Sequence, residues 1–496
     1  MQRSTLLIGA AVLLLSALIA GTASAQMINL KTVPVASGDQ FLIYPSQNLS
    51  MGGVSIALDD PFLDPFVNPA RGSRTQGVQL FGSPTFYSIT NNNGGARTLP
   101  FALLYGEDDW FGAVSLTLQE LRAPDDEFSF GPQPLIFPET GNTLSEGSAT
   151  NKYFFGMIGH KLPGTGMSVG GSISLADLNA VDGVEHLYAL SESIDQYGSV
   201  FDVRVGFLNQ LSGDRTFEAL LLHNRFRMTH DVTYFDFIWD QPVDCCAPTT
   251  VRREERNLDR TDTWGLHMEY TQPLTDTGWR VGGIATANYK SHPKIPNYEI
   301  MNIPRDPGHS WAYNLGVGVS RQAGQARFGL DLIYEPIKSS TWAEANIELP
   351  TADGGVLTIG SKSIENDFDF SNAIMRVGLS REGERGGLSL GLQVRSTDYQ
   401  LRQRDNVALT RRTQQEHWLE WTPTWGGVIH FPEFEIRYTG RATLGTGRPS
   451  VAWTGLRGAT VDQAAAADFI IAPSGPLTLQ DASVFTHQVS VAIPIR

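Results

Sequence analysis

The sequence predicts an all-β fold, a transmembrane antiparallel β-barrel of 14 to 16 strands with an N-terminal plug segment. Long stretches alternate strictly between apolar and small or polar residues, which is typical of strands whose two faces meet different media. The composition agrees, with 50 glycines, 41% hydrophobic residues and only 18% charged residues. Short turns also alternate with long loops, as expected of barrels in a bacterial outer membrane.

Residues 1–25 are predicted to be a secretory signal peptide. A single positive charge, Arg3, precedes an apolar run, and Ala-Ser-Ala at 23–25 supplies the small residues of a cleavage site before Gln26. A membrane-anchoring helix is the alternative, but the apolar run is short for a span. We therefore expect export, and a mature chain that begins near Gln26.

The stretch from Ser46 to Arg74 is the one part of the remaining chain that lacks a strand pattern. It contains a glycine pair, an acidic pair and three prolines. Proline removes a backbone donor and disfavours helix in the preceding residue, so compact loops or single turns are expected. We assign residues 26–75 to an N-terminal periplasmic or plug segment and residues 76–496 to the barrel. The residues expected to form the plug or hatch are Met51, Gly52, Gly53, Asp59, Asp60, Asp64, Asn68, Pro69 and Ala70.

The motif Ser…Met-Gly-Gly…Ala…Asp-Asp-Pro…Asn-Pro-Ala in this stretch resembles the N-terminal signature of FadL-like outer-membrane barrels. That superfamily includes transporters of hydrophobic compounds and the PorV and PorQ proteins of type IX secretion. The resemblance implies fourteen strands, a hatch that closes the pore, and sideways movement of a ligand toward the membrane. Two features depart from the fatty-acid transporters: the longer stretch Gln26 to Pro45 precedes the motif, as in PorV and PorQ, and the chain ends in Arg496 instead of an aromatic residue.

The strand pattern is clearest in three runs. From Trp311 to Val319 every odd position is apolar and every even position is small or polar, and residues 264–270 and 388–394 alternate in the same way. A secreted soluble β-protein, such as a propeller or a sandwich, is the competing architecture, but its strands are usually about 5 to 6 residues long. Many runs here are long enough to cross a bilayer when tilted, and aromatic residues gather at their ends, where interfacial girdles would lie.

Seven short turns and eight long loops can be traced between the runs. A chain that both starts and ends with a strand then has sixteen strands, whereas the family resemblance implies fourteen, and both numbers stay open. The short turns fall near 106–109, 162–166, 211–214, 273–277, 322–324, 382–385 and 431–433. The long loops, expected outside the cell, fall near 83–97, 119–150, 178–197, 229–260, 291–308, 337–366, 400–415 and 446–480.

Charge and motif content argue against several function classes. A formal net charge of −15 argues against nucleic acid as a partner, because phosphate binding needs a basic surface. No HExxH motif or phosphate-binding glycine loop stands out, so no catalytic residue, cofactor or metal site is predicted and the protein is not expected to be an enzyme. An outer-membrane hydrolase built from scattered residues is the alternative. The two cysteines, Cys245 and Cys246, are adjacent and are expected to form an exposed loop pair.

In each predicted strand, the charged residues that alternate with the apolar ones are expected to line the lumen. An arginine that faces lipid near the bilayer midplane costs about 2 to 4 kcal/mol, so these side chains should point inward. The arginines concentrate after residue 320, which could make one wall cationic enough to meet an anionic head group; mutual pairing with carboxylates is the alternative. We also expect wall arginines to hold the acidic cluster of the plug by ion pairs that fix its position. The predicted lumen charges are Asp202, Arg204, Glu269, Arg327, Asp331, Arg376, Arg395, Glu435, Arg437 and Arg441.

Together these features predict a barrel in the outer membrane of a diderm bacterium. It would transport or bind hydrophobic or amphipathic small molecules through a plugged lumen, with outer-membrane lipid as its surroundings. The alternative is a PorV-like interaction protein that handles secreted partners, and hence secretion-system proteins, at the cell surface. A structural or adhesive barrel is a third interpretation, which rests on the long loops.

Overall fold

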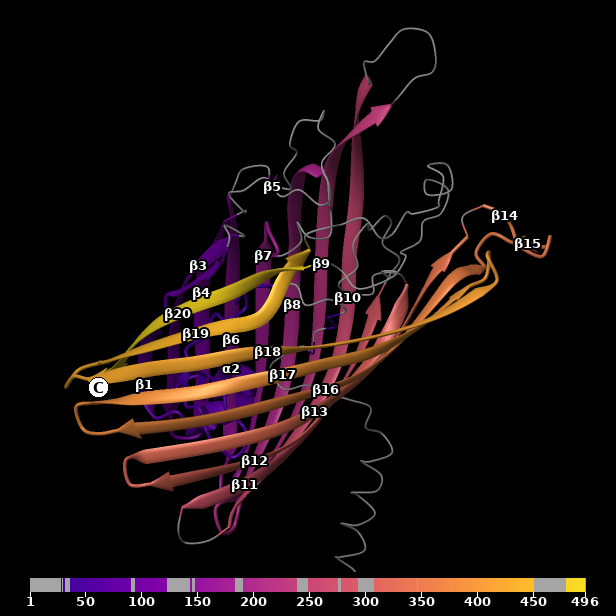
Figure 1. Ribbon diagram of the computed structural model, residues 1–496. Helices are drawn as coiled ribbons and strands as arrows, with labels where there is room; N and C mark the ends of the chain where they lie inside the picture. Colours follow the sequence, from indigo (N-terminus) through magenta and orange to yellow (C-terminus); the bar gives the residue numbers. More distant parts are fainter. Residues whose placement is uncertain are drawn as a thin grey trace, which may run out of the picture.

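The computed structural model describes residues 28, 30–31, 36–90, 94–122, 143–144, 148–182, 191–238, 249–274, 278–292, 307–345, 347–449 and 479–495. These residues form one closed antiparallel barrel (Figure 1). The predicted signal peptide and the pair Cys245-Cys246 lie outside the described residues.

The wall is an eighteen-stranded sheet, and a separate two-stranded sheet of β14 and β15 lies between β13 and β16 in the chain. The strands are β1 (Gly77–Gly82), β2 (Thr85–Ile89), β3 (Gly95–Glu107), β4 (Trp110–Arg122), β5 (Thr143–Leu144), β6 (Ser148–Leu162), β7 (Met167–Leu178), β8 (Ser191–Leu211), β9 (Arg215–Ile238), β10 (Thr249–Pro273), β11 (Trp279–His292), β12 (Gly308–Ala323), β13 (Ala326–Glu344), β14 (Leu349–Pro350), β15 (Val356–Leu357), β16 (Lys362–Glu382), β17 (Gly386–Asp405), β18 (Thr410–His430), β19 (Glu435–Pro449) and β20 (Leu479–Ile495).

The barrel closes where the first and last strands meet. Both β1 and β2 pair with β3 on one side and with β20 on the other, so they form one strand interrupted at Ser83-Pro84. The two-residue β5 only adds to β8. The eighteen strands therefore make a wall of sixteen, which confirms the number from turns and loops and not the fourteen implied by the resemblance.

Several expected long loops are shorter than the sequence predicted. The stretch 83–97 contains β2 and the start of β3, and the stretch 400–415 is a tight hairpin in which Asp405 pairs with Thr410. The ends of β9, β10, β13 and β16 likewise run into the loops expected at 229–260 and 337–366. Beyond the bilayer both faces of a strand meet water, so the alternation that marks a strand disappears while the ladder of backbone hydrogen bonds continues.

The two faces of the wall differ as the alternation predicted. Outward side chains are apolar and exposed, for example Leu116 (61% exposed), Val317 (60%) and Leu388 (76%). Neighbouring inward positions such as Thr117 and Ser389 are polar or small and at least partly buried. Among the described residues, none of the helices has the length and apolar character required to cross a membrane.

The helices described lie ahead of the first strand. They are η1 (Leu49–Met51), α2 (Asp64–Val67) and η2 (Pro69–Arg74), and Figure 1 shows α2 among the strands. We call residues 36–75 the luminal segment, because its side chains contact inward-facing residues on several walls. Its main apolar core joins Phe62 and Phe66 to Phe111 and Phe155 of the wall.

Candidate functional site

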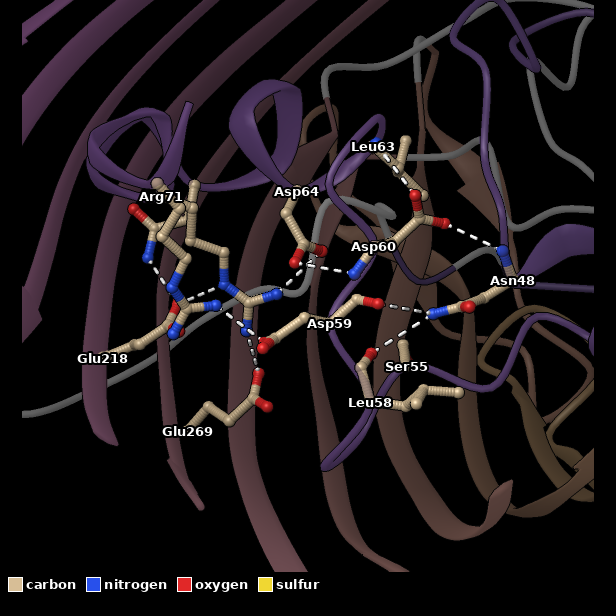
Figure 2. Close-up of polar contacts among 12 residues, drawn as sticks. Asn48, Ser55, Leu58, Asp59, Asp60, Leu63, Asp64, Arg71, Glu218 and Glu269 are labelled. Atoms are coloured by element: carbon tan, nitrogen blue, oxygen red, sulfur yellow. Dashed lines mark hydrogen bonds and ion pairs between the residues drawn. The ribbon is translucent and has the colours of Figure 1, made fainter. Parts of the chain in front are cut away.

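The luminal segment takes its local shape from Asp60. Its carboxylate accepts hydrogen bonds from Ser46 Oγ at 2.5 Å and from the backbone N–H groups of Gln47 and Asn48 at 3.1 and 3.0 Å. It also accepts from the N–H groups of Phe62 and Leu63, both at 3.2 Å. A carboxylate that accepts several backbone N–H groups ties two stretches of irregular chain together, so Asp60 organises the segment itself (Figure 2).

Arg71 connects the segment to the wall. Its guanidinium lies 2.7 Å from Asp64 of α2, 2.5 Å from Glu218 of β9 and 2.8 Å from Glu269 of β10. Figure 2 shows these three carboxylates around the guanidinium, and Arg71 is buried. Asn68 supports the arrangement by donating from Nδ2 to Glu218 at 2.9 Å. We call Arg71, Asp64, Glu218 and Glu269 the Arg71 cluster.

The cluster has more acidic than basic groups, and this shifts its titration. Burial raises the pKa of Asp64 to about 8, although Arg71 acts to lower it. Burial alone would lower the pKa of Arg71, but Asp64 and Glu218 hold it well above its usual range. Asp59 lies at the edge of the cluster. Loss of water around its carboxyl acts to raise the pKa of Asp59, but Arg74 at 2.6 Å outweighs that effect and keeps this pKa below its usual value.

The direction of this pairing is opposite to the one expected from the sequence. Among the described residues, the acidic cluster Asp59, Asp60 and Asp64 makes no ion pair with a wall arginine. Asp59 pairs with Arg74, and Asp64 pairs with Arg71, both within the segment. The ion pairs that reach the wall from this part of the segment run from Arg71 to the wall carboxylates Glu218 and Glu269. The alternation along a strand predicts which face of the wall carries a charged side chain, but it does not predict which opposite charge lies nearest to it.

The predicted lumen arginines pair mainly with other wall residues. Arg204 lies 2.7 Å from Asp202, and Arg395 lies 2.5 Å from Glu335. Arg327 and Arg437 share Glu382 at 3.3 and 3.2 Å, and Arg437 is 3.4 Å from Glu435. Among the predicted lumen arginines, Arg441 alone makes an ion pair with the described part of the segment, at 3.3 Å from Asp39.

Other wall charges contact neutral groups of the segment. Arg204 donates to the carbonyl of Val67 at 3.2 Å, Arg327 to Gln47 Oε1 at 3.1 Å, and Arg376 to the carbonyl of Gly53 at 3.2 Å. Asp331 of β13 accepts from the backbone N–H groups of Ser55 and Ile56 at 2.8 and 3.2 Å. The predicted lumen charges therefore form a network around the segment, but mostly through backbone groups.

Met51 and Gly52 lie against glycines of the wall. Gly52 has φ of +74°, and Met51 is fully buried. A Cβ on Gly391 of β17 would lie 2.1 Å from the nitrogen of Gly52, and one on Gly378 of β16 would lie 2.2 Å from the carbonyl oxygen of Met51. Backbone can approach backbone this closely only where no side chain intervenes. We call this contact the glycine contact.

The Asn68-Pro69-Ala70 turn meets the opposite wall in a similar way. Asn68 Oδ1 accepts from the N–H of Ala70 at 3.1 Å, which closes the start of η2. A Cβ on Gly206 of β8 would lie 1.9 Å from Asn68 Oδ1, and one on Gly170 of β7 would lie 2.7 Å from Pro69. The sequence indicated that such a fit was possible, because these wall glycines occupy inward-facing positions of their strands.

An aromatic patch on the inner wall was not predicted. Tyr399 and Trp418 contact each other edge to face with ring centroids 6.3 Å apart. Phe368 and Phe370 stack on each other, and both rings are tilted against Tyr399. The aromatic patch, from β12, β13, β16, β17 and β18, consists of Ala312, Ile337, Phe368, Phe370, Tyr399, Leu401 and Trp418.

Two residues from the start of the predicted mature chain cover this patch. Ile28 and Leu30 are each 3% exposed and pack into the same apolar cluster. Lys290 of β11 donates to the carbonyl of Ile28 at 2.7 Å, and Lys31 pairs with Glu420 at 2.9 Å. The apolar inward residues break the polar-inside rule of their strands, which is the signal that could have revealed the patch.

A third group lies at the end of the barrel with short turns. His430 is 3.1 Å from Glu382 and 3.5 Å from Glu435, and the three could hold a metal ion. Arg327 and Arg437 already pair with these carboxylates, so the geometry is that of an ion-pair network.

Comparison with known proteins gives similarity at the level of fold. No family model matches the chain, and no curated protein matches it. Among solved structures, it is similar to a Pseudomonas aeruginosa FadL homologue at 10% identity and a TM-score of 0.46, over 93% of this chain and 100% of that one. It is similar to the Ralstonia pickettii toluene transporter TbuX at 11% identity and a TM-score of 0.39, over 95% and 100% of the two chains. It is also similar to the Pseudomonas putida toluene transporter TodX at 11% identity and a TM-score of 0.37, over 90% of this chain and 97% of that one. In fold, the chain resembles FadL-like outer-membrane barrels.

Proposed function

We propose that this protein binds hydrophobic or amphipathic small molecules inside an outer-membrane barrel and passes them across a lumen closed by the luminal segment. Two of the similar structures are toluene transporters, which supports an apolar cargo for this chain by analogy. Export by a signal peptide and residence in a diderm bacterium are parts of the same proposal. No catalytic role belongs to it.

The aromatic patch is the observation that carries the proposal. Inward positions of a water-filled barrel are usually polar, yet here four aromatic rings gather on one inner wall. Apolar pockets with a few convergent polar groups are typical of small-molecule sites. Lys290 and the Arg395–Glu335 pair supply such groups on the same side of the barrel. Ile28 and Leu30 now cover the patch, so a ligand would take their place.

Binding of naphthalene, a fluorescent apolar probe, tests this proposal in nanodiscs that contain the full mature chain. Phe370→Ser removes a ring from the patch and should weaken binding about tenfold, because a buried aromatic contributes roughly 1.5 to 3 kcal/mol. Ile28→Ser with Leu30→Ser should strengthen binding, since the competing side chains are lost. Leu390→Ser, on the outward face, is the matched control and should change little. Equal binding by the parent and Phe370→Ser would contradict the proposal.

The PorV-like interaction role stays a prediction from the motif. It would require a secreted partner to contact the barrel, and the luminal segment would then serve as a docking arm. Retention of full naphthalene binding by every patch variant, together with capture of secretion-system proteins by the intact barrel, would favour that role.

A further inference from the structure

Four charged or polar rungs follow one another on the outer face of β9 and β10, toward the ends with long loops. In register, Arg225 lies opposite Asp262, Arg227 opposite Arg260, Thr229 opposite Leu258, and Asp231 opposite Arg256. Arg225 pairs with Asp262 at 2.9 Å, and Arg256 pairs with Asp231 at 2.7 Å. Two rungs lie between these ion pairs, and the rung of Arg227 and Arg260 places two guanidinium groups side by side.

Arg227 and Arg260 differ from Arg225 and Arg256, because neither of them pairs with a carboxylate. Both are exposed, and neither makes an ion pair or a hydrogen bond with the part of the chain that the structure describes. Like charges directly opposite on adjacent strands destabilise a sheet, so strand stability does not account for the pair. Two forks of N–H donors at one place suit an oxyanion with several acceptors, above all a phosphate.

The height of the pair on the barrel identifies the source of the phosphate. Just below it, His223 stacks on Trp264 with ring centroids 4.1 Å apart, and Trp264 lies in register with Tyr289, which neighbours Trp311 at 5.0 Å. A row of outward aromatic residues is typical of the membrane interface. Arg260 precedes Trp264 by four residues in β10, so it lies about 13 Å nearer the end of the strand with the long loop.

Below the aromatic row the outer surface is apolar. Val205 of β8 and Leu221 of β9 lie in register and are 57% and 58% exposed. A lipid whose acyl chains lie against these side chains would bring its head group past Trp264 to the level of the two arginines. The end with long loops is the outer end of such a barrel, so this lipid belongs to the outer leaflet.

We propose that Arg227 and Arg260 form a binding site for a phosphate on the head group of an outer-leaflet glycolipid. The two guanidiniums bind the phosphate, the aromatic row lies at the level of the head-group sugars, and the apolar wall of β8 and β9 contacts the acyl chains. The site is on the outer surface and does not depend on what the lumen carries.

Native mass spectrometry of the full mature chain in detergent, titrated with diphosphoryl lipid A, tests the site. Arg227→Gln with Arg260→Gln should raise the Kd about tenfold or more, because each basic residue near a lipid surface contributes roughly 1 kcal/mol. Lipid A stripped of both phosphates should bind the parent no better than diphosphoryl lipid A binds this double variant. Arg227→Lys with Arg260→Lys should recover part of the affinity.

The matched control removes two outward positive charges elsewhere. Lys338 and Arg402 are exposed on β13 and β17 with Asp369 between them, and Lys338→Gln with Arg402→Gln should change the Kd less than twofold. Equal loss in both double variants would mean general charge attraction and overturn the site. So would equal binding of phosphorylated and stripped lipid. Displacement of lipid A by an equal concentration of inorganic phosphate would show a site for a free anion and overturn the lipid assignment.

Discussion

The luminal segment contacts the barrel in different ways in two of its regions, which we call the Arg71 end (residues 64–74) and the glycine end (residues 49–57). At residues 64–74 a charge cluster adds to the close packing of Asn68 and Pro69 on wall glycines, because Arg71 contacts Asp64, Glu218 and Glu269 within 2.8 Å. At residues 49–57 it is held by shape and backbone hydrogen bonds, because Met51 and Gly52 lie against Gly378 and Gly391 and the N–H of Gly52 donates to Thr424 at 2.8 Å.

The difference matters for how each end could release. A buried charge cluster is sensitive to the loss of a partner, because the groups left behind have neither water nor a counter-ion. A close-packed backbone contact is indifferent to pH and salt but sensitive to added volume. If the segment closes the lumen, the Arg71 end is the part that solution conditions can loosen, and the glycine end is the fixed part.

The largest effect is expected from Arg71→Gln. This change removes the guanidinium partner of buried Glu269 and leaves buried Glu218 with Arg74 alone, at 3.7 Å. Breaking a buried pair typically costs about 3 to 5 kcal/mol. The strands pair only with one another, so the barrel should still insert. Conductance in planar bilayers should rise strongly, while migration on gels before and after boiling should still report a folded barrel.

Arg74→Gln serves as the control for this change. Arg74 lies 2.6 Å from Asp59, whose side chain is 60% exposed, and exposed pairs contribute about 0 to 1 kcal/mol. Its contact with buried Glu218 is longer, at 3.7 Å, and Glu218 keeps Arg71 at 2.5 Å in this variant. A conductance rise as large as that of Arg71→Gln would show that any lost charge opens the lumen. No rise in either variant would mean that the Arg71 cluster does not hold the segment in a closing position.

A smaller effect is expected from Gly391→Val at the other end. The new side chain meets the backbone of Gly52, and overpacking of this kind typically costs about 1 to 3 kcal/mol. Single-channel recordings should show longer openings that depend little on salt. Gly283→Val is the matched control, because Gly283 also lies in a strand but a Cβ there would have its nearest neighbour at 3.7 Å. Similar recordings from both glycine variants would rule out a specific role for the glycine contact.

The sequence predicted the wall better than it predicted the contacts inside it. Alternation specifies strands and faces because lipid and water select opposite side chains, and this held for runs such as 311–319. It could not indicate Glu218, because Leu220, Leu221 and Leu222 are apolar on both faces and hide the inward parity.

Contacts between distant residues were beyond the same reasoning. Arg71 meets Glu269 and Ile28 meets Tyr399 only because the closed barrel brings them together. Local pattern carries no information on which height of the lumen a segment will occupy. The sequence predicted that Met51 to Gly53 and Asn68 to Ala70 belong to the plug, but it did not show which wall residues they contact. Those wall residues are glycines, which allow the close approach because they have no side chain.

The smallest expected effect is the pH dependence of the charge-held end. Burial raises the pKa of Asp64 from 3.8 to about 8 when the segment is in place, so the closed state binds a proton that the released state lacks. A raised pKa stabilises the closed state fully below pH 3.8, and this stabilisation is lost as pH rises through 8, by at most about 1.4 kcal/mol per pH unit. Conductance of the parent should therefore increase between pH 6.5 and 8.5.

Other groups titrate nearby, so the comparison with Asp64→Asn decides the assignment. Asp182, which accepts from the N–H of Gly38 at 2.5 Å, has its pKa raised to about 6 by burial, below the range of the experiment. His267 lies 3.7 Å from Glu269 and is present in both proteins. Asp64→Asn keeps the shape and stays neutral, so its conductance should be flatter across this range and lower than that of the parent at pH 8.5. An equally steep rise in the variant would assign the pH dependence to a group other than Asp64, and a fall in the parent would contradict a protonated Asp64 in the closed state.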